Sequence, residues 1–212
     1  MTELDKKINE IFPGLVVRKD LTKLVKGNAI VPSYVLEYLL GQYCATDDEN
    51  TILSGVERVK EILAKHYVHR NEAALVRSRI KEKGRHKVID KITVDLNDKT
   101  GCYEAVFSNL GIKGVLVDSS IVKKHQRLLV GGVWCIADME FTRSEDPRIV
   151  PWIMGTLKPI QVSHFDIEKF IEGRKQFSTE EWIDFIIQTI GFNPEQLSQR
   201  NKMFQITRLV CY

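Results

Sequence analysis

Between residues 87 and 163 the sequence alternates between apolar and polar side chains over several short runs, and this pattern constrains the fold more than any other feature. The first run, residues 88–96, places Ile92, Val94 and Leu96 on one face of an extended chain. The residues that follow it, NDKTG, are typical of a turn. Alternation with a period of two, bounded by turn residues, predicts a strand that enters a hairpin.

Four more strands are predicted in the same stretch, at residues 103–107, 112–117, 132–141 and 157–163. Asp118 and the two serines after it are typical of a helix N-cap, so a short helix is expected over residues 121–127. Pro159 cannot donate to a hydrogen-bond ladder, which assigns the last strand to an edge or a bulge. Three strands, a helix and two strands is the order of an OB barrel. A generic antiparallel sheet with a helix on one face is the alternative.

Helices are predicted on both sides of this stretch. Apolar residues recur at helical spacing in segments that begin near Thr2, Ser33, Asp47 and Asn71, and Gly84 ends the last of these. Ser178 and Glu181 form a capping box for a later helix, and another begins at Asn193. We therefore predict an α+β fold with a helical subdomain at residues 1–84, a five-stranded OB-like antiparallel barrel at 85–164 and a helical segment at 165–212.

The composition excludes several classes of protein. No apolar run is long enough to span a bilayer, and the charged N-terminus lacks the apolar core of a signal peptide. Cys44, Cys102, Cys135 and Cys211 are scattered without a CxxC pair, which is not the spacing of a zinc site or a disulfide framework. Cys102 and Cys135 fall in predicted strands and are expected to be buried. A cytoplasmic protein that does not enter the membrane is the expectation.

We find no catalytic constellation in the sequence. It lacks the GxxxxGK[ST] phosphate loop, the GxSxG elbow and the HExxH zinc motif. His66 and His69 have no third ligand nearby and are predicted to be surface or capping residues. Asp138 and Glu140 are predicted to be solvated on the outer face of one strand. We therefore expect no catalytic residue, no metal site and no cofactor within these residues.

The positive charge of the chain is concentrated in one segment. Residues 70–91 hold 8 lysine or arginine and 3 acidic residues, whereas residues 1–69 hold 9 and 10, and residues 92–212 hold 14 and 15. Like charges four residues apart, as at Arg77 and Lys81, destabilise a helix by roughly 0.2–0.5 kcal/mol per pair, and a bound polyanion reverses that effect.

A second basic group lies on the helix predicted within the barrel. The residues predicted to contact DNA are Arg77, Arg79, Lys81, Lys83, Arg85, Lys87, Lys123, Lys124 and Arg127. A solvated basic helix face that binds nothing is the alternative.

Five strings in the sequence resemble one protein family. They are YVLEYLLGQYCATDDE (34–49), KEILAKHYVHRNEAALVRSRIKEKG (60–84), SNLGIKGVLVD (108–118), LLVGGVWCIAD (128–138) and QFSTEEWIDFIIQTIGFNPE (176–195). They closely resemble the BrxL family, the Lon-like AAA+ proteins of BREX anti-phage defence systems, and the similarity covers the entire chain. The resemblance implies a ring-forming ATPase that encircles duplex DNA, similar in plan to the MCM helicases.

The resemblance also implies the place of this chain within a family member. It corresponds to the N-terminal region, before the Walker A loop, the AAA+ core and the Lon-like C-terminal domain, so ATP and Mg²⁺ are expected only in the AAA+ domain. Double-stranded DNA, other copies in a ring and other BREX proteins are the expected partners. Two alternatives remain: a winged-helix DNA reader built from helices 47–83 and the first two strands, or an oligomerisation and docking module that meets acidic neighbours instead of DNA.

Overall fold

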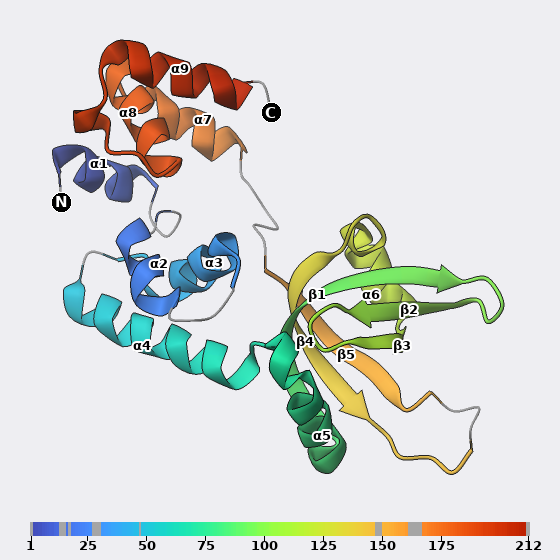
Figure 1. Cartoon of the computed structure of the whole chain (residues 1–212). Coiled ribbons are helices and arrows are strands. Elements are labelled where there is room, and N and C mark those ends of the chain that lie inside the picture. Colours follow the sequence, from blue (N-terminus) through green and yellow to red (C-terminus); the bar gives the residue numbers. More distant parts are fainter. Residues whose placement is uncertain are drawn as a thin grey trace. The chain divides into compact units, whose positions relative to one another are not determined.

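A computed structural model of the protein describes residues 2–12, 16, 18–26, 31–46, 48–146, 150–160 and 167–210 (Figure 1). The chain divides into two units. One comprises Met1–Leu24, Leu40–Val56 and His164–Tyr212, and the other comprises Val25–Leu39 and Glu57–Ser163. Each unit combines segments that are far apart in the sequence. The domain boundaries at residues 84 and 164 stay a prediction.

The second unit contains a closed barrel of five strands. These are β1 (Arg85–Asn97), β2 (Cys102–Phe107), β3 (Ile112–Val117), β4 (Val133–Phe141) and β5 (Trp152–Pro159). The order around the barrel is β1-β2-β3-β5-β4. Neighbours pair antiparallel except β3 with β5, which are parallel. The predicted α+β class and five-stranded barrel are therefore confirmed, and the barrel is mixed rather than wholly antiparallel.

Two strands differ in extent from the prediction. β1 begins at Arg85, and β5 runs over residues 152–159 instead of 157–163, of which 161–163 lie outside the described residues. β3 pairs with β5 only at Ile153 and Met154, so Pro159, at the far end of β5, has a paired strand only on its β4 side. The missing N–H of this proline is tolerated there because nothing pairs with it on the other side.

The barrel core is built from one face of each strand. In β4 the alternating residues Val133, Cys135, Ala137 and Met139 are buried, as predicted. Burial raises the pKa of the Cys135 thiol to about 12, as expected for an inert structural cysteine. Two predicted inward residues are exposed instead, Leu96 and Cys102, because the hairpin of β1 and β2 continues past the core.

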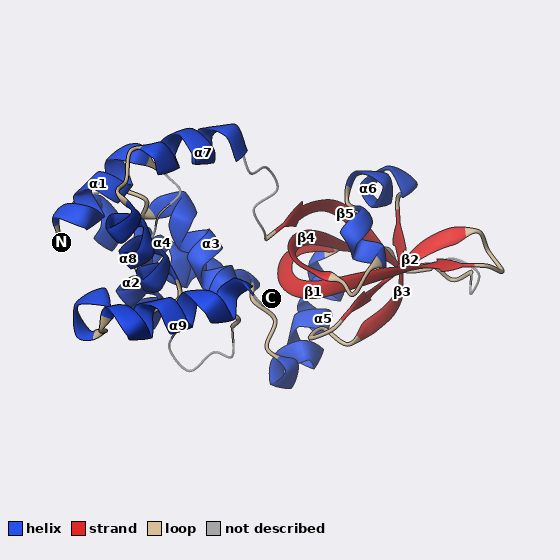
Figure 2. Cartoon of the chain, turned by 90° about the horizontal axis from the view of Figure 1, so that it is seen from above, coloured by secondary structure: helices blue, strands red, loops and turns tan. Residues whose placement is uncertain are grey.

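Two helices close opposite ends of the barrel in both views (Figures 1 and 2). α5 (Ala73–Lys83) contributes Val76 and Ile80 to the barrel core at one end. At the other end, α6 (Ser119–Lys124) contributes Val122, and the 3₁₀ turn η2 (Gln126–Leu129) contributes Leu128. The Asp118 carboxylate caps α6 by accepting from the Ser120 N–H, as predicted, but α6 ends at Lys124. Arg127 therefore lies in η2 and not in the predicted helix.

The remaining helices before the barrel are α1 (Glu3–Ile11), α2 (Lys19–Lys26), α3 (Ser33–Tyr43), α4 (Glu49–His66) and the 3₁₀ turn η1 (Arg70–Glu72). The sequence analysis did not predict α2. Asn71 lies within η1 and does not cap α5, whereas Gly84 ends α5 with a φ of 73°, as predicted. Asp47, the predicted start of α4, is outside the described residues. Asp48 accepts from the Thr51 N–H there instead.

The first unit is held by an aromatic cluster. α1 packs against α7 (Ile167–Lys175) and α8 (Thr179–Thr189), and the 3₁₀ turn η3 (Pro194–Gln196) and α9 (Gln199–Val210) follow. Phe12 lies 5.5–6.3 Å, between ring centroids, from Phe170, Phe177, Trp182 and Phe185. The Ser178–Glu181 capping box of α8 is confirmed. None of the helices in the described residues is long and apolar enough to cross a membrane.

Candidate nucleic-acid interface

The cations of α5 lie on two flanks of the helix and not on one outward face. Arg77 and Lys81, four residues apart, share one flank. The Arg77 guanidinium lies beside Gly111, 3.7 Å from where a Cβ would be, and the Lys81 ammonium lies 5.4 Å from the centre of the Phe141 ring. Val76 and Ile80 face the barrel. Arg77 and Lys81, each one position later, therefore lie at the side of the helix, next to the barrel. Arg77 and Arg79 are half-buried along the sides of α5, whereas Lys81 and Lys83 are exposed.

Arg79 and Lys83 occupy the other flank, where they act electrostatically on His86. Burial is the main cause that lowers the pKa of His86, and the positive charges of His66, Arg79 and Lys83 lower it further. A histidine that responds to neighbouring cations in this way reports a local positive potential. This flank therefore has a positive potential at His86.

His66 and His86 meet where the end of α4 lies against the start of β1. The His66 Nδ1 donates to the carbonyl oxygen of Lys87 at 2.9 Å, and His86 in turn hydrogen-bonds the main chain at Lys65. The two ring centroids are 5.7 Å apart. Burial also lowers the pKa of His66, and the charges of Lys65 and Lys87 add to that effect.

We define the junction surface as the residues that gather at this contact: Lys65, His66, Arg79, Lys83, His86 and Lys87. Lys65 and His66 belong to α4, the next two residues to α5 and the last two to β1. Within the described residues, none of its lysines or arginines forms an ion pair. Lys65 is absent from the predicted residues because α4 and β1 meet through a parallel bridge between Tyr67 and Ile89, which no local sequence pattern indicates.

Arg85, by contrast, is balanced by carboxylates of β4. Its guanidinium lies 3.0 Å from the Asp138 carboxylate and 3.5 Å from that of Glu140. Burial acts to raise the pKa of Asp138, but hydrogen bonds from Thr156 and Arg85 outweigh it and hold that pKa below its ordinary value. Asp138 is only 7% exposed, so the prediction of a solvated carboxylate is wrong. Arg85 thus contributes less unbalanced charge than its neighbours.

Asp90 removes another negative charge from the surface of this segment. It is fully buried, and its carboxylate accepts N–H groups from Lys91, Asn109 and Leu110 at 2.7–3.0 Å. Burial raises the pKa of Asp90. One of the 3 acidic residues of the basic segment therefore lies inside the barrel, where it holds the turn between β2 and β3.

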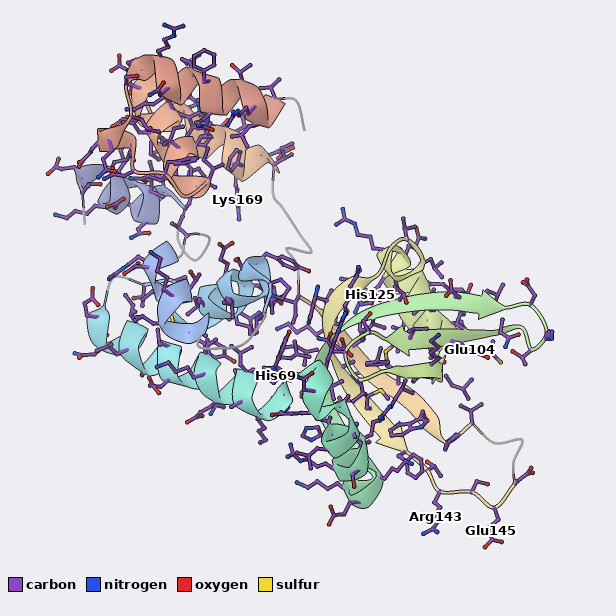
Figure 3. The ribbon with its side chains drawn as sticks, viewed as in Figure 1. His69, Glu104, His125, Arg143, Glu145 and Lys169 are labelled. Atoms are coloured by element: carbon purple, nitrogen blue, oxygen red, sulfur yellow. The ribbon has the colours of Figure 1, made fainter. Side chains whose placement is uncertain are left out.

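The second predicted basic group lies apart from the first. Lys123 and Lys124 on α6 and Arg127 in η2 are exposed, and α6 is at the opposite end of the barrel from α5 (Figure 2). His125, which ends α6, is labelled in Figure 3. The structure thus does not bring the nine predicted residues together as one surface.

His69 has a packing role. It lies in the connection from α4 to α5 (Figure 3), edge-on to Tyr67 at 4.8 Å, and Tyr67 stacks on Trp134 at 5.9 Å. In the part of the chain that the structure describes, no three histidine, cysteine or acidic side chains are grouped as they would be around a metal ion. The junction surface has the chemistry of an anion-binding surface, because its ammonium, guanidinium and imidazole donors outnumber the nearby carboxylates of Glu82 and Asp138.

Two family models match the chain. Residues 10–141 match the model described as "BREX system Lon protease-like protein BrxL N-terminal", and residues 152–212 match the model described as "Lon-like protease BrxL-like, ATPase domain". Neither match depends on the geometry above, and together they cover most of the chain.

Two curated relatives carry the name "Lon-like protease BrxL". The relative from Escherichia coli O9:H4 (strain HS) is 47% identical over 210 residues, and the one from Bacillus cereus (strain H3081.97) is 49% identical over 211. Each match covers 99% of this chain but only 30% or 31% of the relative. The chain therefore spans less than a third of the length of these relatives.

Proposed function

The chain belongs to the BrxL family of BREX Lon-like proteins, and on that premise we propose that it is the DNA-binding N-terminal region of a phage-restricting AAA+ ATPase. The region contacts the phosphate backbone of duplex DNA, largely without sequence specificity, and assembles as part of a ring. ATP and Mg²⁺ act in the AAA+ domain. The proposed setting is the cytoplasm, with other BREX proteins as candidate partners.

The observation that carries this proposal is the junction surface. Four cations from three elements surround two histidines there. Two carboxylates near this segment are engaged, Asp90 inside the barrel and Asp138 with Arg85, while Glu82 is exposed beside Lys83 on α5. Phosphate oxygens accept from lysine and arginine without reading the bases, so a surface of this kind supports sequence-independent binding.

The nine predicted residues have different weights, and Arg85 has the least because Asp138 and Glu140 balance its charge. Arg79, Lys83 and Lys87 lie on the junction surface, with Lys65 added. Arg77 and Lys81 form a secondary contact on the other flank of α5. Lys123, Lys124 and Arg127 are a separate candidate contact at the other end of the barrel. We do not favour the winged-helix alternative, because β1 and β2 belong to a closed barrel and not to a two-stranded wing.

The test reverses two charges on the junction surface. Arg79→Glu with Lys83→Glu should weaken binding to two duplexes of unrelated sequence to the same degree, measured by fluorescence anisotropy across a salt series. The slope of log K against log salt should fall by about 0.9 for each phosphate contact that is lost. The matched control is Lys99→Glu with Lys113→Glu, which makes the same change in net charge on exposed residues of other elements.

The outcomes separate three cases. Loss of binding in the Arg79 and Lys83 variant alone supports the junction surface. Equal loss in the control means that binding follows net charge and not this surface. Wild-type affinity and slope in the first variant mean that DNA binds elsewhere, or that the region docks acidic protein partners instead.

A further inference from the structure

α9 exposes apolar side chains that nothing in the described chain covers. It is a helix of 12 residues with none of them buried. Met203 is 51% exposed and Phe204 is 56% exposed. Large apolar side chains next to each other on one helix mark an interaction surface more often than a solvated one.

The way in which α9 is attached shows that this face points away from its neighbour. The Lys202 ammonium pairs with the Asp184 carboxylate of α8 at 2.6 Å, and the Lys202 side chain is only 11% exposed. The side of α9 that carries Lys202 therefore lies against α8. Met203 and Phe204, which follow it along the helix, are turned away, and the Arg200 guanidinium lies over the Phe204 ring at 5.6 Å.

The charge of α9 indicates what kind of surface fits it. Its sequence, QRNKMFQITRLV, contains Arg200, Lys202 and Arg208 but no acidic residue. In a two-fold contact between copies the same patch meets itself, so two α9 helices would bring arginines together without a carboxylate to balance them. A surface that is apolar at its centre and acidic at its rim complements α9, and a second α9 does not.

The family match places α9 in a segment that resembles an ATPase domain, which indicates the domain that could supply the complementary surface. Residues 152–212, which include α9, match the ATPase-domain model. This segment contains no GxxxxGK[ST] loop, and the chain spans about 30% of the relatives' length. The nucleotide-binding core of those relatives therefore lies in the part of their sequences that this chain does not match.

We propose that the outer face of α9, with Met203 and Phe204 at its centre and Arg200 and Arg208 at its rim, is the surface on which the nucleotide-binding core of the ATPase domain packs. α9 then links the helices of the first unit to the ATPase core. This inference goes beyond DNA binding and does not depend on it.

The test compares the oxidation of Met203 in two proteins. One is the 212-residue chain, and the other is the Bacillus cereus relative with this chain in place of the part that it matches. Hydrogen peroxide should oxidise Met203 rapidly in the chain alone and several-fold more slowly in the chimera, as followed by mass spectrometry. Met139, which is fully buried in the barrel, should react slowly in both and serves as the control for unfolding.

Two results would overturn the proposal. Equal reactivity of Met203 in both proteins, with Met139 protected, means that the ATPase core does not cover α9. A dimer of the chain alone, detected by light scattering and dissociated by Phe204→Ser, means that a second copy covers it. Hydrogen exchange in the natural Bacillus cereus relative, at the peptide that matches residues 199–210, also tests whether the ATPase core covers this helix and does not need the chimera. Fast exchange there contradicts the proposal.

Discussion

At the scale of single residues, the two histidines of the junction surface couple its charge to pH. Both have a pKa below the ordinary value of 6.5, chiefly because they are partly buried and secondly because cations surround them. Each therefore takes up its proton at a lower pH than a free histidine does. Bound phosphates would favour the protonated forms, so DNA binding and proton uptake are expected to be linked.

This linkage predicts two opposite trends as the pH falls below 6.5. DNA affinity should rise, because charged imidazoles add to the surface. Folding stability should fall, because a histidine with a lowered folded pKa stabilises the fold above its unfolded pKa and loses that contribution as it is protonated. The pair His66→Gln and His86→Gln should weaken both trends, measured by anisotropy and by urea unfolding between pH 5 and 7.5. His125, whose pKa burial also lowers, accounts for the residual trend. Unchanged trends in the pair would contradict the assignment.

The adjacent glycines after η2 provide a matched pair of substitutions. Gly131 and Gly132 have φ values of 74° and 77°, so alanine is strained at either position. At Gly132 a Cβ would also lie 2.8 Å from the carbonyl oxygen of Ile92, whereas at Gly131 nothing lies within 4 Å. Gly132→Ala should therefore destabilise the barrel by more than the roughly 1–3 kcal/mol of backbone strain that both share. Equal decreases in the free energy of unfolding, measured in urea, would show that the β1 backbone at Ile92 shifts to accommodate the added Cβ.

At the scale of elements, periodic patterns in the sequence predicted the strands and helices, but not the contacts between elements that are distant in the sequence. β2, β3 and β4 were located to within a residue because turn residues bound each strand and apolar residues recur along it, although Asp138 in β4 and Gly114 in β3 interrupt strict alternation of burial. β5 was misplaced because its alternation is weaker and its burial pattern changes around Gly155. The junction surface could not be predicted as a whole, because Lys65 and Lys87 come together only when α4 meets β1. The spacing predicted the buried side of α5, with Ala73, Val76 and Ile80 inward, but not that its cations divide between two flanks of the helix.

The turn between β2 and β3 depends on a carboxylate of β1. Asp90→Asn replaces an oxygen that accepts N–H groups from Asn109 and Leu110 with an amide that brings its own donors. The buried polar groups left unpaired should cost about 1–3 kcal/mol in urea unfolding. Hydrogen exchange should show faster exchange at the Asn109 and Leu110 amides. Asp95→Asn, an exposed position on the same strand, is the control and should change neither measurement.

At the scale of the whole molecule, the aromatic cluster joins residues from both ends of the chain. Phe12 is 5% exposed and stacks on Phe177, which lies 165 positions later. Phe12→Ala should therefore destabilise the first unit by about 3–5 kcal/mol, the usual range for a buried phenylalanine. Phe192→Ala, at a position 46% exposed, should change stability by less than about 0.5 kcal/mol. Thermal unfolding followed by tryptophan fluorescence would report the loss through Trp182, and equal effects would contradict a shared core.

The same aromatic cluster determines the order in which parts of the protein can fold during synthesis. α1 leaves the exit tunnel long before the rings that cover Phe12, which lie between residues 170 and 185. The barrel strands pair with one another, and β1 also bridges to Tyr67 through Ile89, so the barrel emerges in the interval and can close without α1, α7 or α8. Domains generally fold during synthesis. The barrel should therefore be folded while α1 is still exposed, before the aromatic residues that cover Phe12 are synthesised. The apolar face of α1 is therefore available to a chaperone that binds nascent apolar segments during this interval.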